Sequence, residues 1–562
     1  MLIFEYVNSD DLVPSKLWRR VYNAFGYGDV LLTVGTGKLT EKEEEGLGLA
    51  GEHDFAVLDM KEVGEHRLAL VKNPWSNGTT WKGLLPGSDR LDHSDWAEDQ
   101  ETPPQHLENS LRDAGPLKPG TFWMDLNNIF QSFESIYLNW NPGLFSHRQD
   151  THFSWDLTNH GSAAGCFFSN PQYAVSSRAG GTVWLLLSRH FQTIQSLGNM
   201  DSRSSEITIQ RDVGFISLYA FDKAGQRVFQ SDGALYRGPY VDSPNTLLRL
   251  DMAQNMDYTI VISEQSLPRS KYNFTLSAFS LKPVSIAPAA EKYTFCTKHE
   301  GAWAGSSAGG NANSASYHSN PQFSLHLSAS SDIALLIESS NEDLSVHVKL
   351  VWAGGNRVTG VTTRDITGES GEYRHGCALA EIRNVHAGVY TIVCSAFEAG
   401  QLGRFVLRVG TMVDCIVKPI PVERAGRFRP WLPPASFSPG VDRVLAPLVV
   451  QRITRLKMTA CHQLQSAGQT AHARSPLKAS LEVGQGPYKQ VLAVSANDDF
   501  SDSPAGVRIL DIDVRPEMHG KGGLWLVIER LGGSSAERDE KVDVELFSEG
   551  PVEVGQWGSG TG

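Results

Sequence analysis

The sequence predicts a mainly β, multi-domain protein in which tandem antiparallel β-sandwiches follow an N-terminal unit of a different kind. Three observations lead to this fold class. The chain has 562 residues, far more than one hydrophobic core covers, so several domains are expected. Its 53 glycines and 27 prolines favour strands and turns over long helices. Two long segments of short, strand-like runs also align with each other, which indicates a duplicated unit.

Charge and cysteine content exclude several classes of function. With 50 basic and 63 acidic residues the net charge is −13, so nucleic acid is not an expected partner. The cysteines lack the paired spacing of a disulfide framework or a zinc site, which fits a reducing, cytoplasmic location. They are Cys166, Cys296, Cys377, Cys394, Cys415 and Cys461. The start "MLIFEYVNSDDLVPSK" has no basic signal-peptide region, and no apolar run reaches the roughly 18 residues of a membrane span.

The N-terminal unit, residues 1–145, contains a predicted hairpin within "GEHDFAVLDMKEVGEHRLALVKNPWSNGTTWKG", which runs from Gly51 to Gly83. A hairpin symmetric about Val63 predicts four facing pairs with compatible side chains. These are Leu58 with Leu68, Ala56 with Leu70, Asp54 with Lys72, and His53 with Asn73. Facing residues bring their Cβ atoms to about 4.5–5.5 Å. The Asn73 side-chain oxygen could then accept a hydrogen bond from one His53 nitrogen and direct the other outwards, as in a papain-type triad. The alternative is an exposed His at a strand start and an Asn that begins a turn.

The duplicated unit is predicted to form two β-sandwiches, over residues 150–282 and 291–410. "NPQYAVSSRAGGTVWLLLS" at 170–188 aligns without a gap with "NPQFSLHLSASSDIALLIE" at 320–338. Later pairs, such as "YTIVIS" at 258 and "YTIVCS" at 390, show a smaller shift, so the first copy has an insertion near 190–211. Short alternating strands separated by Gly, Asn and Ser turns are typical of antiparallel sandwiches.

A third, diverged sandwich is predicted over residues 441–550. Its "GLWLVIERL" at 523 and "KVDVELF" at 541 repeat the closing strand pair of the two earlier units. The segment 411–440 is rich in proline and is predicted to be a linker. The tail "GQWGSGTG" is expected to fray.

Several segments resemble calpain-type cysteine proteases. "EHDFAVLD" and "LVKNPWSNGTTWKG" resemble the His and Asn segments of that family, and "FWMDLNNIFQSFESIYL" resembles the end of its protease core. "WDLTNHGSAAGCFFSNPQY" resembles the opening of the calpain C2-like β-sandwich. "YLNWNPGLFSHRQDTHFSWDL" and the tandem sandwiches resemble a narrower group, the fungal PalB-type proteases of ambient-pH signalling. The resemblance implies that residues 1–145 are the C-terminal lobe of a papain-like core.

The same resemblance implies roles for individual residues. His53 would be the catalytic base, Asn73 its orienting partner and Trp75 the indole that shields this pair from water. Trp81 and Gly83 match the downstream family pattern, whereas "LLPGSDRLDHSDW" departs from it. The family's Gln-x-x-x-x-x-Cys-Trp stretch is absent, and Cys166 is assigned to the sandwich, so no nucleophile is assigned in this chain. We interpret the chain as a fragment or alternative gene model, with a natural pseudo-protease as the second interpretation.

No metal or other cofactor is expected from the remaining motifs. The run "EKEEEG" at 41–46 is interpreted as a solvated loop, with a gating or metal-binding loop as the alternative. His147, His152 and His160 lack the spacing of a shared metal site. Calcium dependence stays open.

Two classes of function follow. The first is a calpain-like endopeptidase that cleaves through an acyl-thioester. PalB-type relatives imply a pH-responsive transcription factor as its substrate, processed in the cytoplasm at endosomal membranes with sorting-complex (ESCRT-III) partners. The second is a non-catalytic sandwich scaffold that binds a protein or lipid. A Gln-x-x-x-x-x-Cys-Trp segment in the upstream coding sequence would favour the first class.

Overall fold

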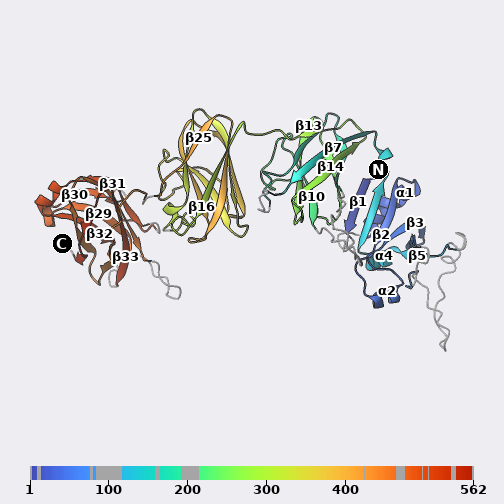
Figure 1. Ribbon diagram of the computed structural model, residues 1–562, viewed down its shortest axis with the longest axis horizontal. Coiled ribbons are helices and arrows are strands. Elements are labelled where there is room, and N and C mark those ends of the chain that lie inside the picture. Colours follow the sequence, from blue (N-terminus) through green and yellow to red (C-terminus); the bar gives the residue numbers. More distant parts are fainter. Residues whose placement is uncertain are drawn as a thin grey trace, which may run out of the picture. The chain divides into compact units, whose positions relative to one another are not determined.

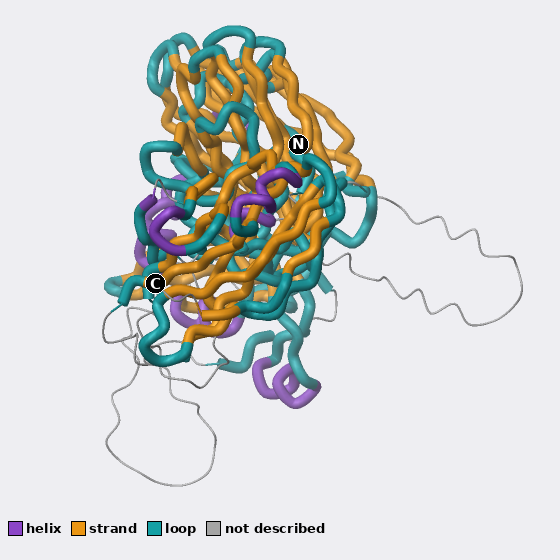
Figure 2. The backbone as a smooth tube through the Cα atoms, turned by 90° about the vertical axis from the view of Figure 1, so that its left-hand side faces the viewer, coloured by secondary structure: helices purple, strands orange, loops and turns teal. Residues whose placement is uncertain are grey.

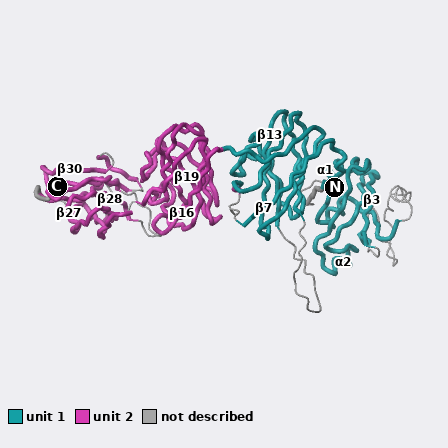
Figure 3. The backbone as a smooth tube through the Cα atoms, turned by 45° about the horizontal axis from the view of Figure 1, so that its top comes forward, with its two compact units in different colours: residues 1–160, 167–292 teal, residues 161–166, 293–562 magenta. Residues whose placement is uncertain are grey.

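The computed structural model divides the chain into two compact units (Figure 3). Unit 1 comprises residues 1–160 and 167–292, and unit 2 comprises residues 161–166 and 293–562. Strands predominate over helices in the described residues (Figure 2). The structure describes residues 3–8, 14–75, 80–83, 117–158, 165–190, 214–314, 316–422, 425–463, 475–495, 498–503, 506–532 and 539–559.

The N-terminal lobe of unit 1 is built on one antiparallel sheet in the order β1-β6-β2-β3-β4-β5 (Figure 1). Its strands are β1 (Ile3–Asn8), β2 (Val30–Gly35), β3 (Asp54–Val63), β4 (His66–Lys72), β5 (Thr121–Asp125) and β6 (Ser135–Trp140). Helices α1 (Pro14–Gly26), α2 (Glu41–Leu47) and α4 (Leu126–Ser132) and the short 3₁₀ helix η2 (Pro142–Leu144) complete the lobe. Helix α1 buries Leu17, Trp18 and Val21 because residues three and four apart share one helix face.

The predicted register of the β3–β4 hairpin is wrong. Val63 pairs with His66, so the turn is Gly64-Glu65 and not a turn centred on Val63. Gly64 has a φ of +61°, whereas the φ of Glu65 is not positive. This matches a two-residue turn with Gly at its first central position. A β-bulge between Val57 and Asp59 then shifts the far end back by one residue, so Ala56 pairs with Lys72 and not with Leu70. Extending this register places Asn73 opposite Phe55 and diagonal to His53.

The first sandwich follows in unit 1. Its two sheets are ordered β11-β10-β13-β8-β15 and β12-β9-β14-β7 and enclose one hydrophobic core. The strands are β7 (His147–Asp156), β8 (Gln172–Ser177), β9 (Gly181–Arg189), β10 (Phe215–Phe221), β11 (Tyr236–Arg237), β12 (Asn245–Met252), β13 (Met256–Gln265), β14 (Lys271–Ser280) and β15 (Ser285–Pro288). The predicted insertion at 190–211 lies almost wholly outside the described residues.

The second sandwich opens unit 2. Its sheets are ordered β20-β19-β23-β17-β25, with β21 beside β19, and β16-β24-β18-β22. The strands are β16 (Phe295–Trp303), β17 (Gln322–Leu327), β18 (Ser331–Ser339), β19 (Ser345–Val351), β20 (Ile366–Glu369), β21 (Arg374–His375), β22 (Cys377–Val385), β23 (Gly388–Ala396), β24 (Gly403–Thr411) and β25 (Cys415–Pro419), with the 3₁₀ helix η3 (Tyr317–Ser319) before β17. Matching β7 with β16, and the following strands in turn, gives both sandwiches one strand order. This is the arrangement that the duplicated sequence predicts.

The third sandwich has the same order again, in sheets β26-β33-β28-β31 and β30-β29-β32-β27-β34, with β35 beside β27. Its strands are β26 (Ala435–Phe437), β27 (Arg443–Val450), β28 (Thr454–His462), β29 (Leu477–Val483), β30 (Gln490–Val494), β31 (Val507–Val514), β32 (Leu524–Arg530), β33 (Glu540–Ser548), β34 (Val552–Val554) and β35 (Gly558–Ser559), with 3₁₀ helices η4 (Gly486–Tyr488) and η6 (Pro516–Lys521). The predicted closing pair forms β32 and β33.

Two sequence expectations differ from the structure here. The segment 411–440, expected to be a linker, contains β25 and β26, because Val417 packs on the second core and Ala435 and Phe437 enter the third. The tail does not fray over its described part. Trp557 donates its indole N–H to the Pro433 carbonyl at 2.9 Å, and β35 pairs with β27.

Within unit 1, the N-terminal lobe and the first sandwich share a hydrophobic core. Leu186 and Phe279 of the sandwich belong to the same buried cluster as the residues of the lobe's sheet. The Trp140 and Trp184 ring centroids lie 5.3 Å apart, and the Arg249 guanidinium carbon lies 4.1 Å from the Trp184 ring centroid. Such contacts fix the two parts of this unit against each other. None of the helices in the described residues has the length and apolar character needed to span a bilayer.

Candidate active site

His53 lies where β3 begins, at the end of a loop held by several hydrogen bonds. Successive residues of this loop each make one of them: Thr36 Oγ1 donates to Ala50 O at 2.6 Å, Gly51 N donates to Glu44 Oε1 at 2.6 Å, Glu52 N donates to Gly37 O at 2.8 Å, and His53 N donates to Thr36 Oγ1 at 3.1 Å. These bonds hold the backbone of His53 in place independently of the contacts of its side chain.

Asn73 follows β4 and is 1% exposed. Its backbone N–H donates to Gly120 O at 2.9 Å, which ties it to the turn before β5. Its side-chain oxygen lies 3.1 Å from His53 Nε2 and accepts from Trp75 N at 3.0 Å. Because a carbonyl oxygen only accepts, His53 Nε2 carries the hydrogen and Nδ1 is the basic nitrogen of the neutral ring. The two side chains thus meet as the sequence predicted, although through a diagonal pair.

Trp75 and Phe55 enclose the imidazole. The His53 and Trp75 ring centroids are 4.1 Å apart with a 37° angle between the planes, and Phe55 meets His53 edge-on at 4.9 Å. Trp75 remains 59% exposed, so it covers one face of His53 while its outer face meets solvent. The Asn73 side-chain N–H₂ is buried and has no hydrogen-bond partner among the described residues.

None of the six cysteines precedes residue 166, so the N-terminal lobe contains no thiol. Cys166 is 6% exposed and stands beside Phe167, which packs on the larger sheet of the first sandwich. Burial raises the pKa of Cys394, and it is also the main influence raising the pKa of Cys415, so neither thiol is activated. All six are free thiols.

The acidic run at 41–46 lies in helix α2 and is not a loop. Thr40 and Glu43 form a capping box, and Gly48 ends the helix with φ +72°. The pattern Thr-x-x-Glu could have revealed this helix from the sequence. Within the described residues no group of three or more His, Cys, Asp or Glu side chains could hold a metal ion.

The other predicted residues do not join His53 and Asn73. His147 and His152 lie on β7, where His152 Nδ1 is 2.7 Å from Thr275 Oγ1, and His160 lies outside the described residues. Trp81 packs on the core of the lobe, where its ring centroid lies 6.5 Å from that of Phe122. Gly83 follows it, and the divergent stretch from Leu84 to Trp96 lies outside the described residues.

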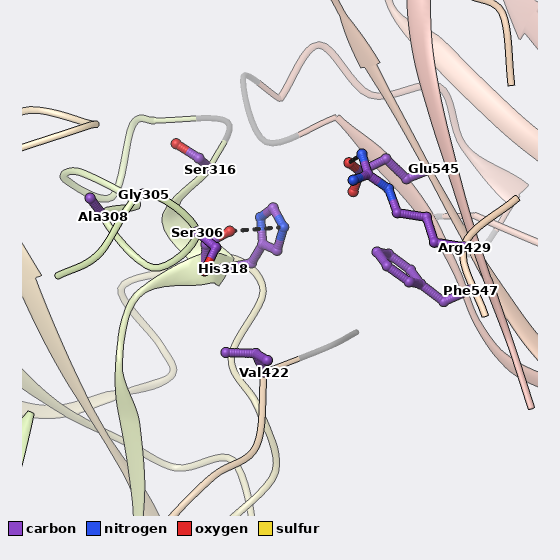
Figure 4. A pocket seen from close by; sticks show the side chains of 10 residues that line it. Gly305, Ser306, Ala308, Ser316, His318, Val422, Arg429, Glu545 and Phe547 are labelled. Atoms are coloured by element: carbon purple, nitrogen blue, oxygen red, sulfur yellow. Dashed lines mark hydrogen bonds and ion pairs between the residues drawn. The ribbon is translucent and has the colours of Figure 1, made fainter. Parts of the chain in front are cut away.

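A cavity of about 290 Å³ lies in unit 2 (Figure 4). Its lining includes small residues such as Gly305 and Ala308, together with His318, Arg429 and Glu545. Arg429 forms an ion pair with Glu545, and Ser319 Oγ lies 3.4 Å from His318 Nε2. These polar groups satisfy one another, so we assign no chemistry to this cavity.

Thr36, Glu44 and Gly120 are site residues that the sequence analysis missed. Each contributes a backbone or side-chain hydrogen bond to a residue distant in sequence, and only the tertiary structure shows such pairs.

Comparison with known proteins places this site in a family. The family described as "Calpain family cysteine protease" matches residues 3–139, and "Calpain-like protease palB-like, C-terminal domain" matches residues 423–561. "Calpain-like protease palB/RIM13" of Aspergillus oryzae is 47% identical over 555 residues, covering 98% of this chain and 62% of that protein. "Calpain-like protease palB/cpr-8" of Neurospora crassa is 33% identical over 649 residues, covering 98% and 67%.

A more distant relative also belongs to the calpains by its name. Human "Calpain-7" is 28% identical over 426 residues, covering 72% of this chain and 49% of that protein. The chain spans 62% of the length of the Aspergillus oryzae relative and the same share of "Calpain-like protease palB" of Emericella nidulans, which is 46% identical. The matches to the fungal proteins extend over nearly all of this sequence, through the lobe and the three sandwiches. The chain therefore belongs to the calpain-type cysteine proteases, in the group of palB-like members.

Proposed function

We propose that this chain supplies the base and its orienting residue to a papain-type endopeptidase, in which a companion lobe supplies the cysteine thiolate. The observation that carries the proposal is the hydrogen bond between His53 Nε2 and Asn73 Oδ1, at 3.1 Å, beneath Trp75. It leaves His53 Nδ1 as the nitrogen available to a thiol.

Each step of the proposed reaction uses His53 Nδ1. It takes the proton of the thiol, and the thiolate sulfur attacks the carbonyl carbon of the peptide bond. The C–N bond then breaks, the leaving amine takes the proton from His53, and an acyl-thioester remains. Water attacks the thioester and gives its proton to His53, which releases the carboxylic acid and restores the thiolate. Asn73 keeps the ring in one tautomer and orientation throughout.

The proposed reaction needs no cofactor, and its calcium dependence is to be measured by adding a chelator. We further propose that the substrate is a pH-responsive transcription factor, processed in the cytoplasm by enzyme recruited to endosomal membranes through sorting-complex (ESCRT-III) partners. The resemblance to palB-like proteases supports this proposal. The three β-sandwiches, which we propose to be C2-like, would position the substrate or recruit the enzyme.

A second candidate function is a scaffold without catalysis, which binds a protein or lipid through its sandwiches. The observation that favours it is the series of three β-sandwiches, which make up the chain from β7 onwards. The two candidates differ in whether His53 matters for peptide-bond cleavage.

Turnover of an unstructured peptide substrate tests the proposal. The variants are built in the chain joined to the upstream lobe of the same gene. We expect the joined chain to cleave, His53→Ala to lose about 10³-fold or more, and Asn73→Ala to lose roughly 10²-fold because the base is misplaced. Cys166→Ser should retain activity. A joined chain indifferent to His53→Ala would favour the scaffold, and activity of the lone chain that Cys166→Ser removes would overturn the assignment.

A further inference from the structure

We propose that Thr36 is a positioning residue for the base His53. The inference rests on the proposed function, because it concerns how that base is held. Thr36 follows β2, is 7% exposed, and contacts His53 through both its backbone and its side chain.

The pairing of β2 with β3 changes at this point. The regular ladder ends with Gly35 opposite Asp54. One residue further, Thr36 N still donates to His53 O at 3.0 Å, but His53 N donates to the Thr36 hydroxyl at 3.1 Å. A side-chain oxygen thus accepts the N–H of the base where the backbone leaves the sheet.

The same hydroxyl also holds the preceding turn. Thr36 Oγ1 lies 2.6 Å from Ala50 O and 3.2 Å from His53 O, so its single hydrogen goes chiefly to Ala50. Between these residues stands Glu52, a non-glycine residue with φ +48°. Such a backbone conformation persists only where neighbouring contacts impose it. The Thr36 hydroxyl bridges both ends of that turn.

The other contacts of the loop cannot replace this one. Glu44 accepts a hydrogen bond from Gly51 N and Gly37 accepts one from Glu52 N, so these two bonds hold the residues before His53 and not the His53 N–H itself. Without the Thr36 hydroxyl, the His53 N–H loses its acceptor, and the residue can rotate away from Asn73 and Trp75. We therefore expect the orientation and tautomer of the imidazole to depend on Thr36.

Histidine NMR on the chain as it stands tests this without a nucleophile. With ¹⁵N-histidine labelling, and His53→Gln to assign the signal, the wild type should show His53 with hydrogen on Nε2. Thr36→Val should give a mixture of tautomers, while Thr36→Ser, which keeps the hydroxyl, should restore the wild-type signal. Thr33→Val, the same substitution on β2 three residues earlier, is the control. An unchanged His53 signal in Thr36→Val would overturn the proposal.

Activity of the joined chain adds a second readout. Thr36→Val should lower kcat about ten- to hundredfold with little change in KM, because the substrate surface is intact but the base is misplaced. Thr36→Ser should recover most of kcat. Equal losses in Thr36→Val and Thr33→Val would indicate a merely structural role. If Thr36→Val does not fold, Thr36→Ala takes its place. A joined wild type without activity would refute the proposed function, while the NMR result would still decide the role of Thr36.

Discussion

In the first sandwich the Gln172 side chain forms hydrogen bonds with both the backbone C=O and the backbone N–H of Val228. In the second sandwich the Gln322 side chain forms the same two bonds with Val358. The four distances lie between 2.7 and 2.9 Å. Other, partly buried hydrogen bonds also recur in both. Arg227 and Arg357 donate to backbone carbonyls at 168–170 and 318–320, and Thr259 and Thr391 donate to those of Gln226 and Asn356. The Tyr240 and Tyr373 hydroxyls form hydrogen bonds with those of Ser263 and Ser395. The two copies thus repeat a set of polar contacts as well as an apolar core.

The outer faces of the smaller sheets differ. In the first sandwich Trp184, Leu186 and Phe279 face the N-terminal lobe and join its core. The corresponding register positions of the second sandwich hold Ala334, Leu336 and Gly410. Gly410 is covered by Tyr293 of its own sandwich, whose ring lies 3.0 Å from where a Cβ would stand. The two copies therefore share the polar contacts that stabilise the sandwich fold. They differ on the outer face of the smaller sheet, which determines what each sandwich packs against.

The larger sheets differ at two buried positions. His347 occupies the register position of Ser217, since these residues pair with Ser395 and Ser263 respectively. Two residues further, Lys349 occupies the position of Tyr219. The first copy thus holds a serine and a tyrosine where the second holds a histidine and a lysine.

The largest expected effect comes from placing a charge on the outer face that the first sandwich shares with the lobe. Leu186 is fully buried there. Leu186→Asp should lower the free energy of unfolding of unit 1 by about 4 kcal/mol or more, because an unpaired carboxylate enters an apolar core. Hydrogen exchange should rise in β2 and β6 of the lobe as well as in β9.

Two further variants test whether the effect belongs to that interface. Leu281→Asp, at a 67% exposed position of the same sandwich, should change stability by no more than about 0.5 kcal/mol. Leu336→Asp in the second sandwich should raise exchange in unit 2 and leave the lobe unchanged. Unaltered exchange of the lobe in Leu186→Asp would contradict the shared core.

A smaller and equal effect is expected from breaking the repeated glutamine contact. Gln172→Met and Gln322→Met keep the side-chain volume but leave the N–H and C=O of the facing valine without partners. Each variant should lose about 3 kcal/mol, given roughly 1–3 kcal/mol for each unsatisfied buried group. Urea unfolding monitored by hydrogen exchange in each sandwich measures it.

Gln401→Met is the control, because among the described residues the Gln401 side chain forms hydrogen bonds only with Glu398, on an exposed turn. This variant should leave the midpoint of urea unfolding unchanged. Losses in the two copies that differed by more than about 2 kcal/mol, the spread of the cost of an unsatisfied buried group, would show that the contact contributes differently to the stability of each copy.

Much of the fold was predictable from the sequence because it is repeated. The Asn-Pro-Gln strand starts and the closing strand pairs mark equivalent positions, and Gln172 and Gln322 indeed open β8 and β17. The hairpin register was not predictable, since a bulge at Leu58 leaves no signal in the alternation of side chains. Helix α2 was missed because its acidic composition outweighed its capping box.

The candidate site was predictable only in part. The His53–Asn73 pair follows from two short segments of sequence, because each stands at the end of a recognisable strand. The groups that hold the pair, Thr36 and Gly120, lie 17 residues before His53 and 47 after Asn73. Hydrogen bonds between such separated loops depend on tertiary packing, which no local pattern encodes.

The smallest expected effect depends on pH and distinguishes the copies at His347. This side chain is 1% exposed and lies beside Lys349, Glu369 and Tyr373. Its Nε2 is 3.7 Å from Glu369 Oε2, and Lys349 forms an ion pair with the same carboxylate. Burial, and then the Lys349 ammonium, lower the pKa of His347 to about 4, and Glu369 only partly opposes this.

Because the folded pKa lies below the ordinary value of about 6.5, the unfolded chain binds more protons between these limits. The neutral His347 therefore stabilises the second sandwich fully above pH 6.5, and this stability is lost as the pH falls towards 4. Linkage gives a loss of about 2 kcal/mol between pH 7 and pH 5. Hydrogen exchange at both pH values should show the loss in β19 and β23, while β10 and β13 of the first sandwich, which have Ser217 at this position, should change less. His347→Ser should make the pH dependence of stability of the second sandwich similar to that of the first. A second sandwich as stable at pH 5 as at pH 7 would contradict a buried, neutral His347.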